Sequence, residues 1–305
     1  MSEPLVSVVI PTFNYGHLVG EAVDSVLAQS YPRVEIVVVD DGSTDDTRQR
    51  LEKYGERMRY QYQPNAGLSA ARNAGIGLAR GELIALLDSD DAFHPEKLAV
   101  QVRYLADHPE MGLVGTDSFS DEPVKWSDLP CDGLQMYAQE VTLQQVVIKC
   151  RFAPSSVLMR RECFERAGPF DTELKSVEDR DMWIRVAARD RMATIHLPLT
   201  WYRETPGSMS RNAGKMEHFE KVVLERAFSM PELRGRWLLR QKAFGLAAFS
   251  AAWMYHASGE KHVAWRRMIS SFIKWPLPMG VPEVRMPFGR LRLLVRSLLA
   301  GALGR

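Results

Sequence analysis

Three aspartates lie within four residues, directly after the apolar run Leu83–Leu87, which is typical of a buried strand. They are Asp88, Asp90 and Asp91. Carboxylates this close repel one another unless a cation joins them. Mg²⁺ or Mn²⁺ takes oxygen ligands and bridges phosphate groups. Because side chains alternate along a strand, we expect Asp88 and Asp90 to point the same way and to bind the metal. A solvated turn remains the alternative for Asp91.

A second polar segment follows the first predicted strand, Val6–Ile10. Ligands of open α/β sheets bind beyond the carboxyl ends of the strands. We therefore expect the loop after this strand to receive a nucleotide, although a turn after a buried strand would also explain its apolar part. The loop residues are Pro11, Thr12, Phe13 and Asn14.

The next predicted strand, beginning at Val34, ends in two more carboxylates, Asp40 and Asp41. Either can accept a hydrogen bond from a base N–H or a ribose hydroxyl, and we favour Asp41. Ser43 and Asp46 have the spacing of a helix-capping box, so Ser43 is expected to start a helix.

A cation is predicted near these strand ends. Ser69 is a plausible N-cap for a helix over 69–79, and Arg72 falls one turn inside it. A guanidinium and helix-terminal N–H groups suit a diphosphate. An exposed helical arginine without this role is the alternative.

Glu178 and Asp179 begin another predicted helix, where negative charge is favourable in any case. A hydroxyl that acts as a nucleophile must lose a proton as it attacks, so a carboxylate here is also a candidate general base.

The elements that position these residues alternate between strand-like and helix-like spacing of their apolar residues. Over the first 115 residues, short β-branched runs alternate with segments of helical spacing, which predicts an α/β fold with a mainly parallel central sheet flanked by helices. Residues 116–140 look irregular, and a helical extension follows. We divide the chain into residues 1–215, with a nucleotide-binding half about 1–115 and an acceptor half about 116–215, and a helical region 216–305.

Composition is ordinary for a globular protein of 305 residues, with 46% hydrophobic and 25% charged residues. Charge is uneven, since residues 234–305 hold 13 Lys/Arg and 2 Asp/Glu and carry +11, which leaves −10 on residues 1–233. Cys131, Cys150 and Cys163 form no CxxC pair, which favours a reducing compartment. No signal peptide or spanning helix is predicted, so we expect a cytoplasmic protein.

Together these segments resemble family 2 of the glycosyltransferases, which have the GT-A fold. The resemblance extends over roughly residues 7–212. It rests on VSVVIPTFN, VVVDDGSTDDT, NAGLSAARNAGI, RGELIALLDSDD, GPFD and VEDRDMWIR, in the family's order and at its usual spacings.

The resemblance implies a single-displacement, inverting transfer from a nucleotide-diphosphate sugar, with a UDP-sugar favoured, to a glycan or lipid-linked acceptor. It implies that Asp41 and the 11–13 segment contact the base, Asp88 lies toward the ribose and sugar, and Asp90 ligates the metal. Asp179 would be the base, with Glu178 as its partner. Synthesis of a bacterial surface polysaccharide or glycolipid is the expected setting.

One departure from the family pattern concerns the loop after the sheet. Many relatives carry a His before Pro-Gly-Ser, where this chain has Thr205. Arg203 or Arg211 could supply the missing charge to the diphosphate. His196 is expected in a strand, in a structural role.

The basic C-terminal region suggests an anionic partner. Cations and aromatics mix between Trp265 and Trp275, and residues 288–299 have the spacing of an interfacial helix. We favour contact with the inner face of the plasma membrane over helices packed on the catalytic body. Nucleic acid is not expected, because no binding motif accompanies the charge.

Two other classes stay open. A sugar-phosphate nucleotidylyltransferase should show a Gly-rich phosphate loop with Arg and Lys after the first strand, and residues 11–17 lack both. A non-catalytic nucleotide-sugar-binding module would be expected to lose Asp90 or Asp179, and both are present. A dehydrogenase is disfavoured, since no GxGxxG follows a strand.

Overall fold

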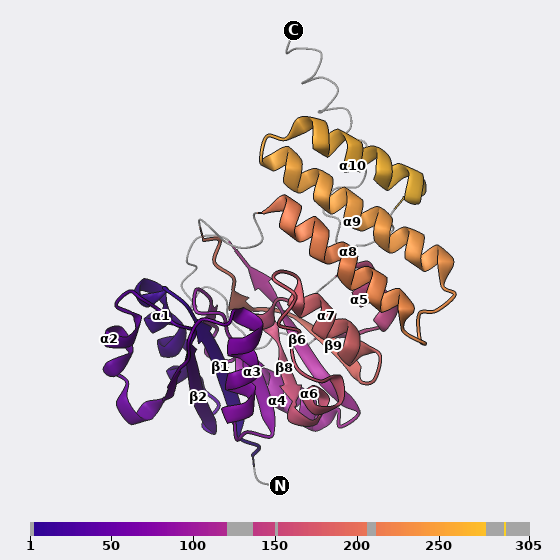
Figure 1. Ribbon diagram of the computed structural model, residues 1–305. Helices are drawn as coiled ribbons and strands as arrows, with labels where there is room; N and C mark the ends of the chain where they lie inside the picture. Colours follow the sequence, from indigo (N-terminus) through magenta and orange to yellow (C-terminus); the bar gives the residue numbers. More distant parts are fainter. Residues whose placement is uncertain (1–2, 121–136, 150–151, 206–211, 279–289, 291–305) are drawn as a thin grey trace. The chain divides into compact units, whose positions relative to one another are not determined.

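The computed structural model describes residues 3–120, 137–149, 152–205, 212–278 and 290 (Figure 1). The strands are β1 (Val6–Thr12), β2 (Val34–Asp40), β3 (Arg59–Tyr62), β4 (Leu83–Leu86), β5 (Ala92–Phe93), β6 (Met111–Phe119), β7 (Ala138–Val141), β8 (Leu158–Arg160) and β9 (Arg191–Trp201). The α-helices are α1 (Gly16–Leu27), α2 (Thr47–Glu52), α3 (Leu68–Leu78), α4 (Lys97–Asp107), α5 (Leu143–Ile148), α6 (Arg161–Ala167), α7 (Glu178–Ala187), α8 (Ala213–Ser229), α9 (Trp237–Ala257) and α10 (Lys261–Lys274).

These strands form one sheet in the order β3-β2-β1-β4-β8-β6-β9-β5, with β7 paired to β9. The first four strands are parallel, as predicted for the nucleotide-binding half. In the second half β8 inserts antiparallel between β4 and β6, while β6 and β9 run parallel. The predicted α/β fold is confirmed, and its antiparallel pairs are concentrated in the second half.

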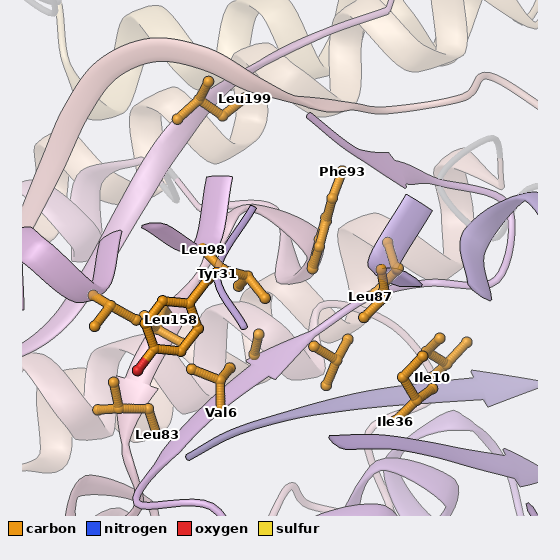
Figure 2. Close-up of a cluster of buried hydrophobic side chains, with 14 of the residues drawn as sticks. Val6, Ile10, Tyr31, Ile36, Leu83, Leu87, Phe93, Leu98, Leu158 and Leu199 are labelled. Carbon is orange, nitrogen blue, oxygen red and sulfur yellow. The ribbon is translucent and has the colours of Figure 1, made fainter. Parts of the chain in front are cut away.

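Both faces of β1, β2 and β4 are buried, which explains why these strands have continuous apolar sequences. Val6, Val8 and Ile10 point to one face, into a cluster with side chains of α1 and α4. Figure 2 shows Val6, Ile10 and, from α4, Leu98 in this cluster. On the other face Val37 and Val39 pack against Ala71 of α3. This double cover leaves the carboxyl ends of the strands as the place where polar loops collect.

Helix α3 approaches the sheet closely through a glycine. A Cβ built on Gly75 would lie 2.3 Å from Cγ1 of Val9, whereas one built on Gly77 would meet nothing within 4 Å. The absence of a side chain at Gly75 therefore sets the distance of α3 from β1, and with it the position of Arg72 on the same helix.

Three strands were not predicted. β3 (RYQY) is a largely exposed edge strand, so it lacks the apolar run that marks its neighbours. β5 has two residues, and β7 (AQEV) buries one side chain of four. Their pairing comes from neighbours distant in sequence, which a local pattern does not contain.

The chain divides into two compact units. One contains residues 1–143 and 151–206, and the other residues 144–150 and 207–305. The predicted boundary fell after residue 215, whereas α8 already begins at Ala213 and packs against α9. In the second unit α8, α9 and α10 lie side by side (Figure 1).

Within the described part of the chain, no helix has the length and apolar character needed to cross a membrane. Cys163 is a buried free thiol, while Cys131 and Cys150 lie outside the described residues. The predicted interfacial helix over 288–299 also lies outside them, apart from Arg290.

Candidate functional site

The loops after β1 and β2 are tied together at the carboxyl edge of the sheet. The Asp41 amide donates to the carbonyl of Thr12 at 2.8 Å, and the Asn14 amide donates to Oγ of Ser43 at 2.9 Å. The amide of Thr44 donates in turn to Oδ1 of Asn14 at 2.8 Å. Asn14 has a left-handed φ of 56°, which Asn tolerates better than most residues.

Ser43 is therefore a loop-bracing residue, and its predicted capping role is wrong. Helix α2 begins four residues later, at Thr47, whose amide donates to Oδ1 of Asp45 at 3.0 Å. The Asn14 contact with Ser43 explains the difference, because it uses the hydroxyl for a partner 29 residues away.

Asp41 is buried and holds the loop that leads into α3. Its carboxylate accepts from the amides of Ala66 at 3.0 Å and Gly67 at 2.8 Å, and from Nε2 of Gln63 at 2.7 Å. The neighbouring Asp40 accepts from the Ser43 amide and the Tyr60 hydroxyl. Both carboxylates lie at the predicted strand end, and both order the surrounding loops.

Arg72 lies at the centre of the candidate site and is 1% exposed. One terminal nitrogen donates to Oδ1 of Asp88 at 2.7 Å, and the other to Oε1 of Glu178 at 2.6 Å. The two carboxylates raise the pKa of Arg72 despite its burial, so the guanidinium stays charged. Arg72 thus joins the end of β4 to the start of α7, and the alternative of an exposed helical arginine is excluded.

Asp88, Asp90 and Asp91 have different surroundings. Asp88 pairs with Arg72, while Oδ2 of Asp90 accepts from the Thr205 hydroxyl at 3.1 Å. Asp91 is 2% exposed and accepts from Oγ of Ser155 and the amide of Arg203. The solvated turn considered for Asp91 is therefore wrong, because this carboxylate fastens the loops before β8 and after β9.

Burial and the nearby charge of Asp88 raise the pKa of Asp90 above its usual value. The same two causes raise the pKa of Asp91 well above its usual value. Negative charge at the end of β4 is thus incompletely compensated. A cation bound at this point would relieve the repulsion.

The loop after β9 closes on the aspartates. The Thr205 hydroxyl bonds Asp90, and its Oγ1 lies 3.4 Å from the Tyr15 hydroxyl. Nε of Arg203 donates to the carbonyl of Asp90 at 3.0 Å, and the guanidinium also pairs with Glu21. Arg203 therefore brings positive charge beside the aspartates, while Arg211 lies outside the described residues.

Glu178 and Asp179 begin α7, as predicted. The residue before them, Val177, has φ 54°. This left-handed conformation is a genuine outlier for a β-branched residue and costs about 1–3 kcal/mol. It turns the chain so that Glu178 reaches Arg72 at the first position of the helix.

Asp179 lies in the first turn of α7, next to Glu178. Burial and the neighbouring Glu178 raise its pKa to about 7, against the lowering effect of Arg72 and of the Arg180 amide, which donates to Oδ1 at 2.7 Å. A carboxyl with a pKa near neutrality can take up a proton more readily than an ordinary aspartate.

Three polar atoms near this site are buried without a hydrogen-bond partner among the described residues: Oγ1 of Thr12, Oγ of Ser69 and Nε of Arg72. Ser69 is the second residue of α3 and follows Gly67, the helix N-cap, so its predicted capping role is wrong. Unpaired buried polar groups are rare and are often completed by a ligand.

The site could hold a divalent ion only with the help of its ligand. Among the described residues no group of three His, Cys, Asp or Glu side chains forms a ready metal cage. Mg²⁺ and Mn²⁺ nevertheless bind to one or two carboxylates together with substrate phosphates. The carboxylates of Asp88 and Asp90 follow the same strand, one paired with Arg72 and the other bonded by Thr205, and the raised pKa of Asp90 fits a site that a cation completes.

The structure thus connects Arg72, Asp88 and Glu178 directly, and links Asn14 to the loop after Asp41. Sequence reasoning missed Ser155, whose hydroxyl bonds Asp91 and accepts from the Asp88 amide at 3.0 Å. A serine beside another serine in an ordinary loop carries no signal of this contact.

Comparisons with known proteins agree with this geometry. The model of Glycosyl transferase family 2 matches residues 7–167. The chain is 30% identical over 235 residues to the uncharacterized glycosyltransferase EpsJ of Bacillus subtilis, covering 72% of this chain and 67% of that protein. It is 32% identical over 190 residues to an uncharacterized glycosyltransferase of Rickettsia prowazekii, covering 60% of this chain.

The chain spans only part of several relatives, 58% of the Rickettsia prowazekii protein and 32% of one from Rickettsia felis. The putative teichuronic acid biosynthesis glycosyltransferase TuaG of Bacillus subtilis is 42% identical over 107 residues, which are 34% of this chain and 42% of TuaG.

Solved structures show the same fold at low identity. S. aureus TarS 1–349, in complex with UDP-GlcNAc, superposes with a TM-score of 0.59 at 20% identity, over 90% of this chain and 93% of TarS. The mannosyltransferase PcManGT of Pyrobaculum calidifontis, in complex with GDP-Man and Mn²⁺, gives 0.57 at 22% identity, over 99% of this chain and 87% of that one. The fold is therefore GT-A, and this chain belongs to glycosyltransferase family 2.

Proposed function

We propose that this glycosyltransferase inverts the configuration of the sugar that it transfers from a nucleotide diphosphate to an acceptor hydroxyl. The observation that carries the proposal is the buried bridge Asp88–Arg72–Glu178, with Asp179 beside it at a pKa of about 7. The bridge fixes the base next to the strand end where the donor is expected. In one displacement the acceptor oxygen bonds the anomeric carbon, the bond to the diphosphate breaks, and the hydroxyl proton passes to Asp179.

The donor is proposed to lie across the carboxyl ends of β1, β2 and β4. Oγ1 of Thr12 and Oγ of Ser69 are buried without a hydrogen-bond partner among the described residues, and Phe13, which follows Thr12, is 44% exposed. A UDP-sugar is favoured, because TarS carries UDP-GlcNAc in its complex, although PcManGT carries GDP-Man. The proposed donor-binding residues are Pro11, Thr12, Phe13, Asn14, Asp41, Arg72, Asp88 and Arg211.

Mg²⁺ or Mn²⁺ is proposed to be held by Asp90, with Asp88 beside it. When bound, the ion would neutralise charge that develops on the departing diphosphate. The chain itself holds Asp90 in place, since Arg203 donates to its backbone carbonyl and the Thr205 hydroxyl donates to one carboxylate oxygen. Preorganised groups of this kind need not rearrange during the reaction.

A glycan or lipid-linked acceptor, in surface polysaccharide or glycolipid synthesis on the cytoplasmic side of the membrane, is the proposed setting. Its support is the likeness to TuaG, over a third of the chain.

Transfer assays with a panel of nucleotide sugars, with Mn²⁺ or with a chelator, test this proposal. Wild type should release nucleoside diphosphate only with donor and metal together. Asp90→Ala should abolish the metal-dependent release of nucleoside diphosphate. Asp179→Asn should bind donor normally while transfer falls by about three orders of magnitude, since general-base catalysis contributes 10²–10⁴-fold. Poor donor binding by Asp179→Asn would contradict its assignment as base.

The same assay separates the two other classes. Release of pyrophosphate from a sugar phosphate and a nucleoside triphosphate would show a nucleotidylyltransferase. Donor binding without transfer to any acceptor or to water would show a binding module.

A further inference from the structure

One end of the helical unit combines exposed apolar side chains with an excess of positive charge. We define the basic apolar end as residues 234–242, which lead into and begin α9, and residues 272–278, which end and follow α10. Its large exposed side chains are Trp237 and Leu238, each 63% exposed, Ile273 at 77% and Leu277 at 58%. Exposed apolar side chains that gather in one contiguous patch mark a site of interaction with a protein or a membrane.

The two segments are neighbours in space. Nζ of Lys242 lies 5.8 Å from the ring of Trp275, and Nζ of Lys274 lies 5.8 Å from the ring of Phe244. The hydroxyl of Ser271 donates to the Gly245 carbonyl at 2.6 Å. The start of α9 and the end of α10 therefore form one continuous surface.

Trp237 and Leu238 are exposed because the neighbouring helix ends before it reaches them. Phe244 and Gly245 face α10 near its last residue. Residues seven apart lie on the same side of a helix, so Trp237 and Leu238 continue this side for two turns beyond Lys274. An apolar stripe is thus left uncovered at the end of the unit.

The charge of this surface has one sign. Residues 234–242 and 272–278 contain no Asp or Glu. Their cations are Arg234, Arg236, Arg240, Lys242 and Lys274. Among the described residues none of these five forms an ion pair with a carboxylate; the nearest partners of three of them are aromatic rings.

This combination selects among possible partners. Of the chain's own residues 279–305, Arg290 packs on this end, where it donates to the carbonyls of Trp275 and Leu277 and lies over the ring of Phe272. It leaves the four large apolar side chains exposed, and because the segment holds five Arg and one Glu it adds to the positive charge of the surface. Nucleic acid would match the charge but gives no place to Leu238, Ile273 and Leu277. An anionic bilayer offers both phosphate headgroups and an apolar layer beneath them.

We propose that the basic apolar end of the helical unit docks on an anionic lipid membrane, with Trp237, Leu238, Ile273 and Leu277 inserted below the headgroups. The proposal goes beyond the transfer reaction and does not depend on it. It also differs from the sequence expectation, in which Trp265 to Arg267 took part, because Arg267 is paired with Glu217 at 2.6 Å.

Sedimentation of the full chain with vesicles tests the proposal. Vesicles of phosphatidylcholine with added phosphatidylglycerol should bind the protein, and binding should fall as salt rises. Trp237→Ser and Ile273→Ser should each weaken vesicle binding by about tenfold, because each removes an apolar side chain that inserts into the bilayer. Arg234→Gln with Arg236→Gln should weaken it by about tenfold or more, on anionic vesicles only.

The helix supplies a matched control. Trp253 is 44% exposed on α9, sixteen residues and about 24 Å along the helix from Trp237. Trp253→Ser should bind vesicles like wild type. Donor binding should be unchanged in every variant, which separates this test from that of the transfer reaction.

Equal binding to neutral and anionic vesicles would overturn the proposal. So would an equal loss in Trp253→Ser and Trp237→Ser. The surface would instead belong to a second copy of the chain if the protein did not bind vesicles and size-exclusion chromatography showed a dimer that depends on Trp237. That result would also overturn the proposal.

Discussion

At the scale of single residues, Arg72 determines how the carboxylates of the site divide their roles. The guanidinium bonds Asp88 and Glu178 and so compensates the negative charge of those two side chains. It forms no hydrogen bond described for Asp179 and only lowers the pKa of that carboxyl through its charge. Asp179 therefore keeps a high pKa, although it lies next to a carboxylate that stays paired. We expect the bridge to set the pH range of the reaction.

The first prediction concerns Arg72→Met. Loss of the positive charge leaves buried carboxylates unpaired, which should lower the free energy of unfolding by about 3 kcal/mol. It should also raise the pKa of Asp179 further, so the pH profile of kcat should move to higher pH. Arg72→Lys, which keeps the charge but reaches one partner, should shift the profile less. An unchanged profile in Arg72→Met would contradict the coupling.

The second prediction concerns the pH dependence of wild type and of Asp179→Asn. The base must be unprotonated, so wild-type kcat should rise with pH through about 7. A folded-state pKa above the unfolded value means that stability is greatest below pH 4 for this group and is lost as pH rises toward 7. Asp179→Asn should therefore be more stable than wild type at pH 8, by about 1 kcal/mol, in thermal or urea unfolding. Equal Tm values at pH 8 would contradict it.

The strand ends were predicted correctly from the sequence, but the hydrogen-bond and ion-pair partners of the polar residues were not. A solvated turn was the alternative considered for Asp91, which is buried against Ser155 and Arg203. Arg72 had an exposed alternative and is enclosed. Such contacts join segments 64 to 112 residues apart, and spacing within one segment carries no information on them.

At the scale of elements, the sheet was predicted where burial is symmetrical and missed where it is not. β1, β2 and β4 are buried on both faces and have a continuous apolar pattern. β3 and β7 are polar and depend on their neighbours. Helix α6 ends at Ala167, because Gly168, with φ 79°, follows it.

The third prediction concerns the packing of α3. Gly75→Ala would place a Cβ 2.3 Å from Val9 on the central strand, so it should destabilise the fold by about 2–3 kcal/mol and displace Arg72, with loss of donor affinity. Gly77→Ala, two residues along the same helix and open to space, should be neutral or stabilise by up to about 1 kcal/mol. Urea unfolding of the two variants provides the comparison. Equal effects would show that helix propensity, and not close packing, governs both positions.

At the scale of the whole molecule, two stretches of the chain carry opposite net charge, −10 on residues 1–233 and +11 on residues 234–305. The acidic part contains the candidate site and gains from a cation. The basic part has its own exposed surface. A net charge of +1 therefore conceals two surfaces with different partners.

The fourth prediction concerns the folded chain as a ligand-binding body. A ligand that binds only the folded state stabilises it by about 2.7 kcal/mol at one hundred times its Kd, which should raise Tm by several degrees. Donor with Mn²⁺ should produce this shift, and donor with a chelator should produce a smaller one. Asp90→Ala should give the small shift in both conditions. A full shift without metal would separate donor binding from the aspartates.

The left-handed conformation of Val177 offers a way to learn what the enzyme gains from a costly backbone. Glycine adopts this φ without penalty, so Val177→Gly relieves strain in the folded state but also frees the chain when unfolded. If the strain serves to aim α7, the variant should tolerate heat as well as wild type or better and yet turn over more slowly, with KM for the donor unchanged. Heat resistance and catalytic rate would then be opposed at one residue, and directed evolution for thermal tolerance should repeatedly select changes there at the expense of turnover.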